Sequence, residues 1–247
     1  MSDADSLPAP AALSLEVVGT VRVTPRMTRV RLTGDDLTGF QFVAGQDLMF
    51  AVPNGAATMN RRYTIRGFDP VARVVDVDAV LHGDGPGASW MARATPGDRI
   101  DAVGPRGKIV PSTDAEWHLF LGDESGLPAI AVMLEALPAD ATAVALVEVA
   151  DAGEEQPIDT AAAVSLGWIH RAGAQPGDPE LLVDALRSIV LPPGAGHAYL
   201  AAERGVVNAL RGELATRGFE PERVASKAYW KRHEANAAHG EPFPDRP

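Results

Sequence analysis

The chain has no cysteine among its 247 residues. That absence excludes disulfide scaffolds, thiolate zinc sites, cysteine-ligated iron–sulfur clusters and cysteine nucleophiles. If the protein carries out redox chemistry, the reactive group must therefore be a bound cofactor rather than a thiol.

Long apolar runs and an excess of positive charge are also missing. No apolar stretch approaches the roughly 20 residues of a membrane span, and the start, MSDADSLPAPAALSL, lacks the basic and then apolar pattern of a signal peptide. The formal net charge of −11 argues against nucleic-acid binding, which depends on neutralised phosphates. With 46% hydrophobic and 22% charged residues, we expect a soluble, cytoplasmic globular protein outside the membrane.

Neither a metal site nor a hydrolase nucleophile is indicated. None of the six histidines is spaced as part of a metal-binding set, and His233 and His239 are too far apart for a zincin helix. No serine lies in a GxSxG nucleophile elbow. We therefore expect no metal ligands and no catalytic residue in the sense of an acid, base or nucleophile.

The first half of the chain is typical of antiparallel β-structure. Short valine-rich segments, partly alternating and separated by Gly, Pro or Asp, predict a barrel or sandwich. A helical turn is expected between Ser89 and Ala94, and one further strand pair within 95–110. The other predicted strands occupy 13–25, 27–34, 47–53, 61–69 and 71–83.

After about Pro111 the pattern changes to alternating strands and helices, which implies a parallel sheet with helices packed on it. The length suits two domains of ordinary size, and we divide them into 1–112, a β-barrel, and 113–247, an α/β domain. The predicted strands are 117–123, 141–151, 164–173, 197–203 and 223–230, and the predicted helices are 127–138, 179–192 and 204–218.

The stretch RRYTIR, from Arg61 to Arg66, gathers positive charge in an acidic chain. Taken alone, it fits a solvated strand edge whose charges deter aggregation. It also resembles the flavin motif of the ferredoxin-reductase-like superfamily, Arg-x-Tyr-Thr-aliphatic-Arg. Arginine pairs with phosphate oxygens as a rigid fork, and tyrosine can pack on a flavin ring. Alternation along a strand predicts that Arg62 faces away from Arg61 and Tyr63.

A second region narrows the resemblance. It contains Leu81-His82-Gly83, Gly85-Pro86-Gly87, Ala88-Ser89-Trp90, Pro96-Gly97-Asp98 and Gly104-Pro105-Arg106-Gly107, in that order. This succession is similar to that of the siderophore-interacting proteins, which are FAD-dependent ferric-siderophore reductases. A glycine-rich turn that opens a short helix offers backbone N–H groups to a diphosphate.

Two later motifs resemble the same family. LGDESGLPAI, Leu121 to Ile130, follows a strand and sets Gly122 at a carboxyl edge where open α/β sheets bind ligands. Ser125 there is equally suited to capping a helix, and YLAAERGVV is a second such turn. KAYWKR, from Lys227 to Arg232, has the aromatic pair of the family in a basic setting.

The resemblance implies an antiparallel, Greek-key FAD-binding barrel followed by a nicotinamide-nucleotide domain. It implies substrate contacts from Lys227, Lys231 and Arg232, because ferric catecholate siderophores are anionic. It implies cofactor contacts from Arg61, Tyr63, Thr64, Ile65, Val80, Leu81, His82, Gly87, Ala88, Ser89, Trp90, Asp123, Ser125 and Trp230.

The implied function is passage of electrons from NADH, NADPH or a reduced protein such as ferredoxin, through FAD, to the Fe(III) of a ferric siderophore. Two alternatives remain open at this point: a general flavin or ferredoxin-type reductase, and a flavin- or siderophore-binding module without turnover. The acidic residues Glu148, Asp151, Glu154 and Glu155 favour NADH because they would repel a 2′-phosphate, although Arg171 could reverse that preference.

Overall fold

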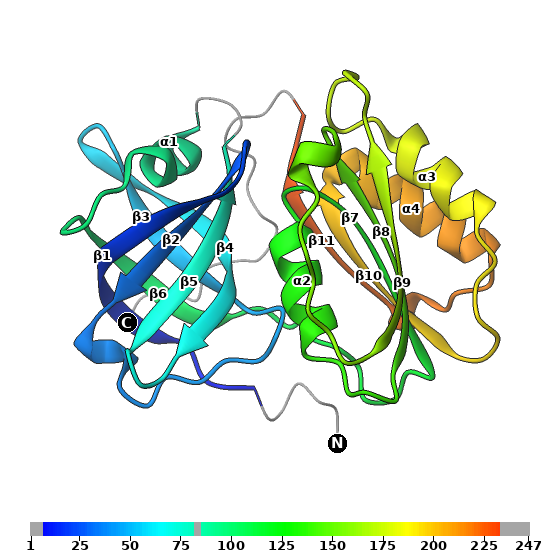
Figure 1. Ribbon diagram of the computed structural model, residues 1–247, viewed down its shortest axis with the longest axis horizontal. Helices are drawn as coiled ribbons and strands as arrows, with labels where there is room; N and C mark the ends of the chain where they lie inside the picture. The colour runs from blue at the N-terminus through cyan, green and yellow to red at the C-terminus, as the bar shows by residue number, and fades with distance from the viewer. Residues whose placement is uncertain (1–6, 82–84, 233–247) are drawn as a thin grey trace.

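The computed structural model describes residues 7–81 and 85–232. Two domains lie side by side, a barrel formed by the first half of the chain and a sheet with flanking helices formed by the second (Figure 1). The connection between them runs from 107 to 116.

The first domain is a closed antiparallel barrel with strand order β1-β2-β5-β4-β3-β6. Strands β3, β4 and β5 follow one another as hairpins, and β6 returns to pair with β3, which is a Greek-key connection. The strands are β1 (Ala11–Thr24), β2 (Met27–Thr33), β3 (Asp47–Asn54), β4 (Ala57–Asp69), β5 (Val74–Val80) and β6 (Arg99–Arg106).

Alternation along the strands fills the barrel. In β2, Val30 and Leu32 are fully buried while Arg31 between them is exposed, because successive side chains point to opposite faces. Helix α1 (Pro86–Arg93) packs its buried Trp90 and Met91 into the same core.

The strand pair expected within 95–110 is wrong. The segment 95–110 contributes one strand, β6, and no pair, because the chain after Arg106 turns through Gly107 (φ 98°) and leaves the barrel for the second domain.

The second domain is a five-stranded parallel sheet of order β11-β10-β7-β8-β9. Every residue of its central strand β7 is buried, as expected for a strand covered on both faces. The strands are β7 (Trp117–Asp123), β8 (Thr142–Val149), β9 (Ala163–His170), β10 (Gly196–Glu203) and β11 (Val224–Trp230).

Helices cover the two faces of this sheet unequally. Helix α2 (Leu127–Glu135) lies on the face turned toward the barrel, whereas α3 (Pro179–Ser188) and α4 (Arg204–Thr216) pack together on the opposite face (Figure 1). The short 3-10 helices are Asp35–Leu37, Ala152–Glu154 and Pro221–Arg223. Within the described ranges, no helix is long and apolar enough to cross a membrane.

Polar contacts join the two domains. Arg66 of β4 forms a double ion pair with Glu135 of α2, both N···O distances being 2.6 Å. At the other end of the interface, the Thr24 hydroxyl donates to the buried carboxylate of Glu154 at 2.5 Å. The Arg66–Glu135 pair holds strand β4 against the sheet domain, so the outward side chains of β4 face that domain.

Candidate functional site

Strand β4 presents different chemistry on its two faces. Ile65 is fully buried in the barrel core, and Tyr63 packs against the same core. Thr64 and Arg66 point the other way, toward Tyr229 and Glu135 of the sheet domain. Arg62 shares their face and pairs with Asp47, so it points away from Arg61 and Tyr63.

Arg61 and Tyr63 meet the start of helix α1 at Gly87. A Cβ at Gly87 would lie 2.5 Å from the Tyr63 hydroxyl and 3.0 Å from Cγ of Arg61, so only glycine allows this approach. Pro86 occupies the first turn of α1, where its missing N–H costs nothing. A cationic side chain, a phenol and a helix N-terminus therefore converge on one place.

Burial sets the protonation of this pair. It raises the pKa of Tyr63 well above its ordinary value, so the phenol stays neutral, and it lowers the pKa of Arg61. The basic side chain beside a helix N-terminus fits a diphosphate, and the neutral ring fits a flavin.

The other residues expected around the flavin are distributed unevenly. Trp90 and Ile65 bury their side chains in the barrel core, which leaves only their backbone for a ligand. Val80 packs against the α2 side of the interface, and the Leu81 N–H donates to the carbonyl of Arg26. Ala88 and Ser89 lie in the first turns of α1, and His82 lies outside the described residues.

Asp123 brings the predicted residues of the sheet domain together. Its Oδ1 accepts from the backbone N–H of Ser125 at 2.9 Å, and its Oδ2 accepts from Nε1 of Trp230 at 2.8 Å and from the backbone N–H of Glu203 at 2.9 Å. Asp123, Glu203 and Trp230 are the last residues of β7, β10 and β11. The cluster therefore marks the carboxyl edge of the sheet, beside the point where strand order reverses.

Of the two helix starts at this edge, that of α4 is capped by a side chain, whereas Gly126, the N-cap of α2, has no side-chain cap. Glu203 caps α4 by accepting from the backbone N–H groups of Gly205 and Val206, and Asp123 accepts from Ser125 just before α2. Gly122 and Gly126 are needed because any Cβ would collide with the carbonyl oxygen of Ala201 on the neighbouring strand. The glycines of this turn thus serve close packing of strands and helix.

The basic tail does not act as one cluster. Arg232 reaches back to the carbonyl of Pro176 at 2.8 Å. Nζ of Lys227 lies 2.6 Å from Oδ2 of Asp47 and 5.0 Å from the ring centre of Tyr229. Lys227 lines a pocket of about 350 Å³ between the domains, whereas Lys231 and Arg232 do not. Of the three residues expected at the substrate site, only Lys227 lines this pocket, and the role of all three in binding substrate stays a prediction.

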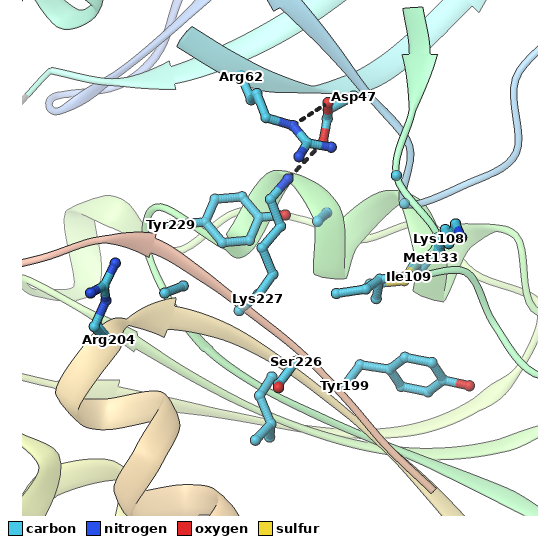
Figure 2. Close-up of a pocket in the computed structure, with 16 residues that line it drawn as sticks. Asp47, Arg62, Lys108, Ile109, Met133, Tyr199, Arg204, Ser226, Lys227 and Tyr229 are labelled. Atoms are coloured by element: carbon cyan, nitrogen blue, oxygen red, sulfur yellow. Dashed lines mark hydrogen bonds and ion pairs between the residues drawn. The ribbon is translucent and has the colours of Figure 1, made fainter. Parts of the chain in front are cut away.

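Figure 2 shows this pocket, with Asp47 and Arg62 on one wall, Lys227 reaching toward them, and Arg204 on the opposite side. Asp47 is 1% exposed, and its two oxygens bind Arg62 Nε at 2.8 Å and Lys227 Nζ at 2.6 Å. Asp47, Arg204 and Lys108 also line the pocket, and no sequence motif had marked them. Alternation along RRYTIR correctly predicted that Arg62 and Arg61 point to opposite faces of the strand. The motif gave no sign that Arg62 pairs with a carboxylate on β3.

A buried ionic cluster lies at the carboxyl edge of the sheet. Arg171 is bound by Glu124 at 2.6 Å and by Glu148 at 3.3 Å, and all three side chains are buried. Burial, reinforced by the negative charge of Asp123, raises the pKa of Glu148 to about 7. Arg171 is consequently not exposed to an incoming phosphate.

Comparison with known proteins identifies the family. The model for the siderophore-interacting FAD-binding domain matches residues 43–109, and the model for the siderophore-interacting protein matches residues 115–233. The chain belongs to the siderophore-interacting protein family. The two matches fall on the barrel and on the sheet domain respectively.

Known proteins resemble the chain over nearly its whole length. A siderophore utilization protein from T. fusca is 34% identical with a TM-score of 0.86, covering 96% of this chain and 98% of that one. Ferric vibriobactin reductase ViuB of Vibrio cholerae is 29% identical over 92% of both chains. An NADPH-dependent ferric-chelate reductase of Escherichia coli is 27% identical over 87% of this chain and 91% of its own length.

Proposed function

We propose that this siderophore-interacting protein is an FAD-dependent reductase that delivers electrons to the Fe(III) of a ferric siderophore and so releases the iron. One observation carries the proposal: the two faces of β4 serve two sites. Arg61 and Tyr63 meet Gly87 on one face, and Arg62 faces a cationic pocket on the other. A flavin and an anionic iron complex would then lie on either side of a single strand.

The residues around Gly87 suit FAD. Arg61 would hold the diphosphate together with N–H groups from the first turn of α1, and Tyr63 would pack against the ring. The Thr64 hydroxyl, 3.4 Å from that of Tyr229, stands where the barrel meets the last strand of the sheet. When bound, FAD would supply the redox chemistry, accepting a hydride and giving up single electrons.

The pocket suits the iron substrate. Siderophores hold iron through hard oxygen donors that favour Fe(III) over Fe(II), so reduction weakens the complex. No group of three or more His, Asp or Glu side chains within the described ranges could hold a metal. In the proposed reaction the iron arrives inside its chelate and leaves the chelate after reduction. In this proposal the residues need only position the two partners, and no acid, base or nucleophile is required.

For the electron donor we propose a nicotinamide nucleotide at the carboxyl edge of the sheet, near Asp123 and Trp230. NADH is favoured over NADPH because Arg171 is bound by two carboxylates. A reduced protein such as ferredoxin is the alternative donor, because Glu203 already caps the start of α4 at this edge.

Anaerobic spectroscopy separates these possibilities. Purified protein reconstituted with FAD should be yellow, and NADH should bleach the flavin absorbance. If only a reduced ferredoxin bleaches the flavin, the electron donor is a reduced protein rather than a nicotinamide nucleotide. The ferric-reductase function would then still hold. A protein that cannot be reconstituted with FAD would contradict the proposal. Reconstitution without turnover by any donor would instead identify a binding module.

A further inference from the structure

The connection between β9 and helix α3 begins at the carboxyl edge of the sheet (Figure 1). Residues 172–177 of this connection form a strap. Strand β9 is one border of the sheet, and β10 and β11 lie three and four strands away from it, which is about 14–19 Å at the usual strand spacing. The contacts at the two ends of the strap show that it spans this distance.

The start of the strap is fixed by buried charge. Arg171 directly precedes it and is bound by Glu148, near the end of β8, and by Glu124, which follows β7. All three side chains are buried, so parting them would leave charges without partners away from water. This end of the strap is therefore a firm anchor above the two strands next to β9.

The far end of the strap meets the last strands of the sheet. Gly177 is buried, and a Cβ there would lie 3.0 Å from Cη2 of Trp230 and 3.1 Å from Cγ of Glu203. Nη2 of Arg232 donates to the carbonyl of Pro176 at 2.8 Å. Glu203 and Trp230 end β10 and β11, so the strap crosses the carboxyl edge from one border of the sheet to the other.

The two ends of the strap differ in how easily they part from the sheet. The hydrogen bond between Arg232 and Pro176 is exposed, and water can replace it at little cost. Ala172 and Gly173, next to the firm anchor, both have positive φ values, 49° and 90°. A few loop residues of this kind are enough to absorb a hinge motion. The strap can therefore swing about its start and release at its far end.

Ligands of open α/β sheets bind just outside the carboxyl ends of the strands, which is where the strap lies. Asp123 and Glu203 at this edge are only 3% and 4% exposed. We propose, resting on the nicotinamide donor proposed above, that the strap is a gate that closes the donor site and that Arg232 is the positioning residue that latches it. Arg232 acts through the strap and not on the reacting atoms.

A closed gate lowers the apparent affinity for the nucleotide in proportion to the fraction of molecules in which the strap is open. Arg232→Ala removes the latch, and Gly177→Ala pushes the strap away from Trp230. Each variant should lower the apparent Kd for the nucleotide by roughly three- to tenfold. The limiting rate of flavin reduction should change less than the affinity. Residues that merely supported the fold would weaken binding when replaced.

The affinity is measured without turnover. Titration calorimetry of the FAD-loaded protein uses tetrahydro-NAD, a nicotinamide analogue that cannot donate a hydride, and anaerobic stopped-flow reduction by NADH gives the limiting rate. Gln175→Ala is the matched control, because Gln175 is exposed in the middle of the strap. Its Kd should stay within about twofold of wild type.

The absence of cysteine allows the strap to be locked shut by design. In a Pro176→Cys, Arg232→Cys double variant, the two thiols can be joined by a short bifunctional maleimide. Before cross-linking, this variant should bind tetrahydro-NAD more tightly than wild type, because the latch is missing. After cross-linking, the Kd should rise at least about tenfold, and retained FAD absorbance shows that the locked protein is intact.

Unchanged or weaker affinity in both Arg232→Ala and Gly177→Ala, or undiminished affinity after cross-linking, would overturn the gate. Absence of tetrahydro-NAD binding in wild type and every variant would overturn the gate together with the nicotinamide donor. The ferric-reductase function is tested separately, with photochemically reduced protein and no nucleotide. Failure to reduce the ferric complex in that assay would remove the function itself, so the failures are distinguishable.

Discussion

Nζ of Lys227 lies 2.6 Å from Oδ2 of Asp47, and this ion pair joins the last strand of the sheet to the third strand of the barrel. The other oxygen of Asp47 binds Arg62, so one buried carboxylate organises cations from both domains. The contact fixes the width of the pocket and the placement of its charge at the same time.

Removing Asp47 should therefore be strongly destabilising. Asp47→Ala leaves Arg62 and Lys227 without their shared carboxylate in a buried wall, and we expect a loss of roughly 3–5 kcal/mol in the free energy of unfolding. Urea denaturation followed by circular dichroism measures it. The control is Asp101→Ala on the exposed side of β6, which should change stability by less than about 0.5 kcal/mol. A comparable small loss for Asp47→Ala would contradict the role assigned to it.

Arg61 and Arg62 lie on opposite faces of β4, so we expect only Arg61 to contribute to FAD binding. Arg61→Ala should weaken FAD binding at least about tenfold, since it removes a cation from the place where the diphosphate is expected. Arg62→Gln, on the other face, should leave FAD affinity within about twofold of wild type. Flavin fluorescence titration of the apoprotein decides between them. An equal loss of FAD affinity in both variants would show that FAD binding does not depend on which face of β4 the arginine occupies.

The fold followed closely from sequence because its signals are local. Valine-rich alternation marked the barrel strands, and buried runs such as 117–123 marked the parallel sheet. Phase along a strand also separated Arg62 from Arg61. The extra strand expected in 95–110 failed because the connection between the domains resembles a strand in composition.

The pairings of the site were harder to predict. Asp47 and Lys227 are 180 positions apart, and no local pattern links a carboxylate on β3 to an amine on β11. The cluster of Lys227, Lys231 and Arg232 was expected from adjacency in sequence, but the end of a strand sends neighbouring side chains in different directions. Trp90 lies in a glycine-rich motif yet fills the core, because an amphipathic helix buries its largest apolar residue.

The cluster around Glu148 predicts a pH-dependent effect on stability. Its folded pKa of about 7 lies above the ordinary value, so the protonated form is favoured in the folded state. The stabilisation is complete below the unfolded pKa and is lost as pH rises through about 7. Glu148→Gln mimics the protonated form, and it should raise the free energy of unfolding by roughly 1–2 kcal/mol at pH 8 with little change at pH 4.5.

Thermal denaturation of both proteins across that pH range provides the measurement. Glu155→Gln is a suitable control, because Glu155 is exposed and pairs with His170 at the surface. A Glu148→Gln variant that is less stable than wild type at pH 8 would show that the charged carboxylate stabilises Arg171 by more than its burial costs.

The placement of Arg171 predicts the nucleotide preference. Because Glu124 and Glu148 already bind its guanidinium, no attraction to a 2′-phosphate is expected from it. The KM for NADH should therefore be equal to or lower than that for NADPH, and 5′-AMP should inhibit at least as well as its 2′-phosphorylated counterpart. A preference for NADPH of about tenfold or more would show that a cationic side chain other than Arg171 binds the 2′-phosphate.

The most direct test of the ferric-reductase account follows a single half-reaction. The FAD-loaded protein is reduced photochemically without nicotinamide, mixed anaerobically with a ferric tris-catecholate, and monitored by flavin absorbance while an Fe(II) chelator reports released iron. The account predicts that the oxidised flavin spectrum returns at a rate that saturates with the ferric complex, that two Fe(II) ions appear for each flavin reoxidised, and that Lys227→Met slows the low-concentration rate. A flavin that stays reduced in the presence of the ferric complex would contradict it.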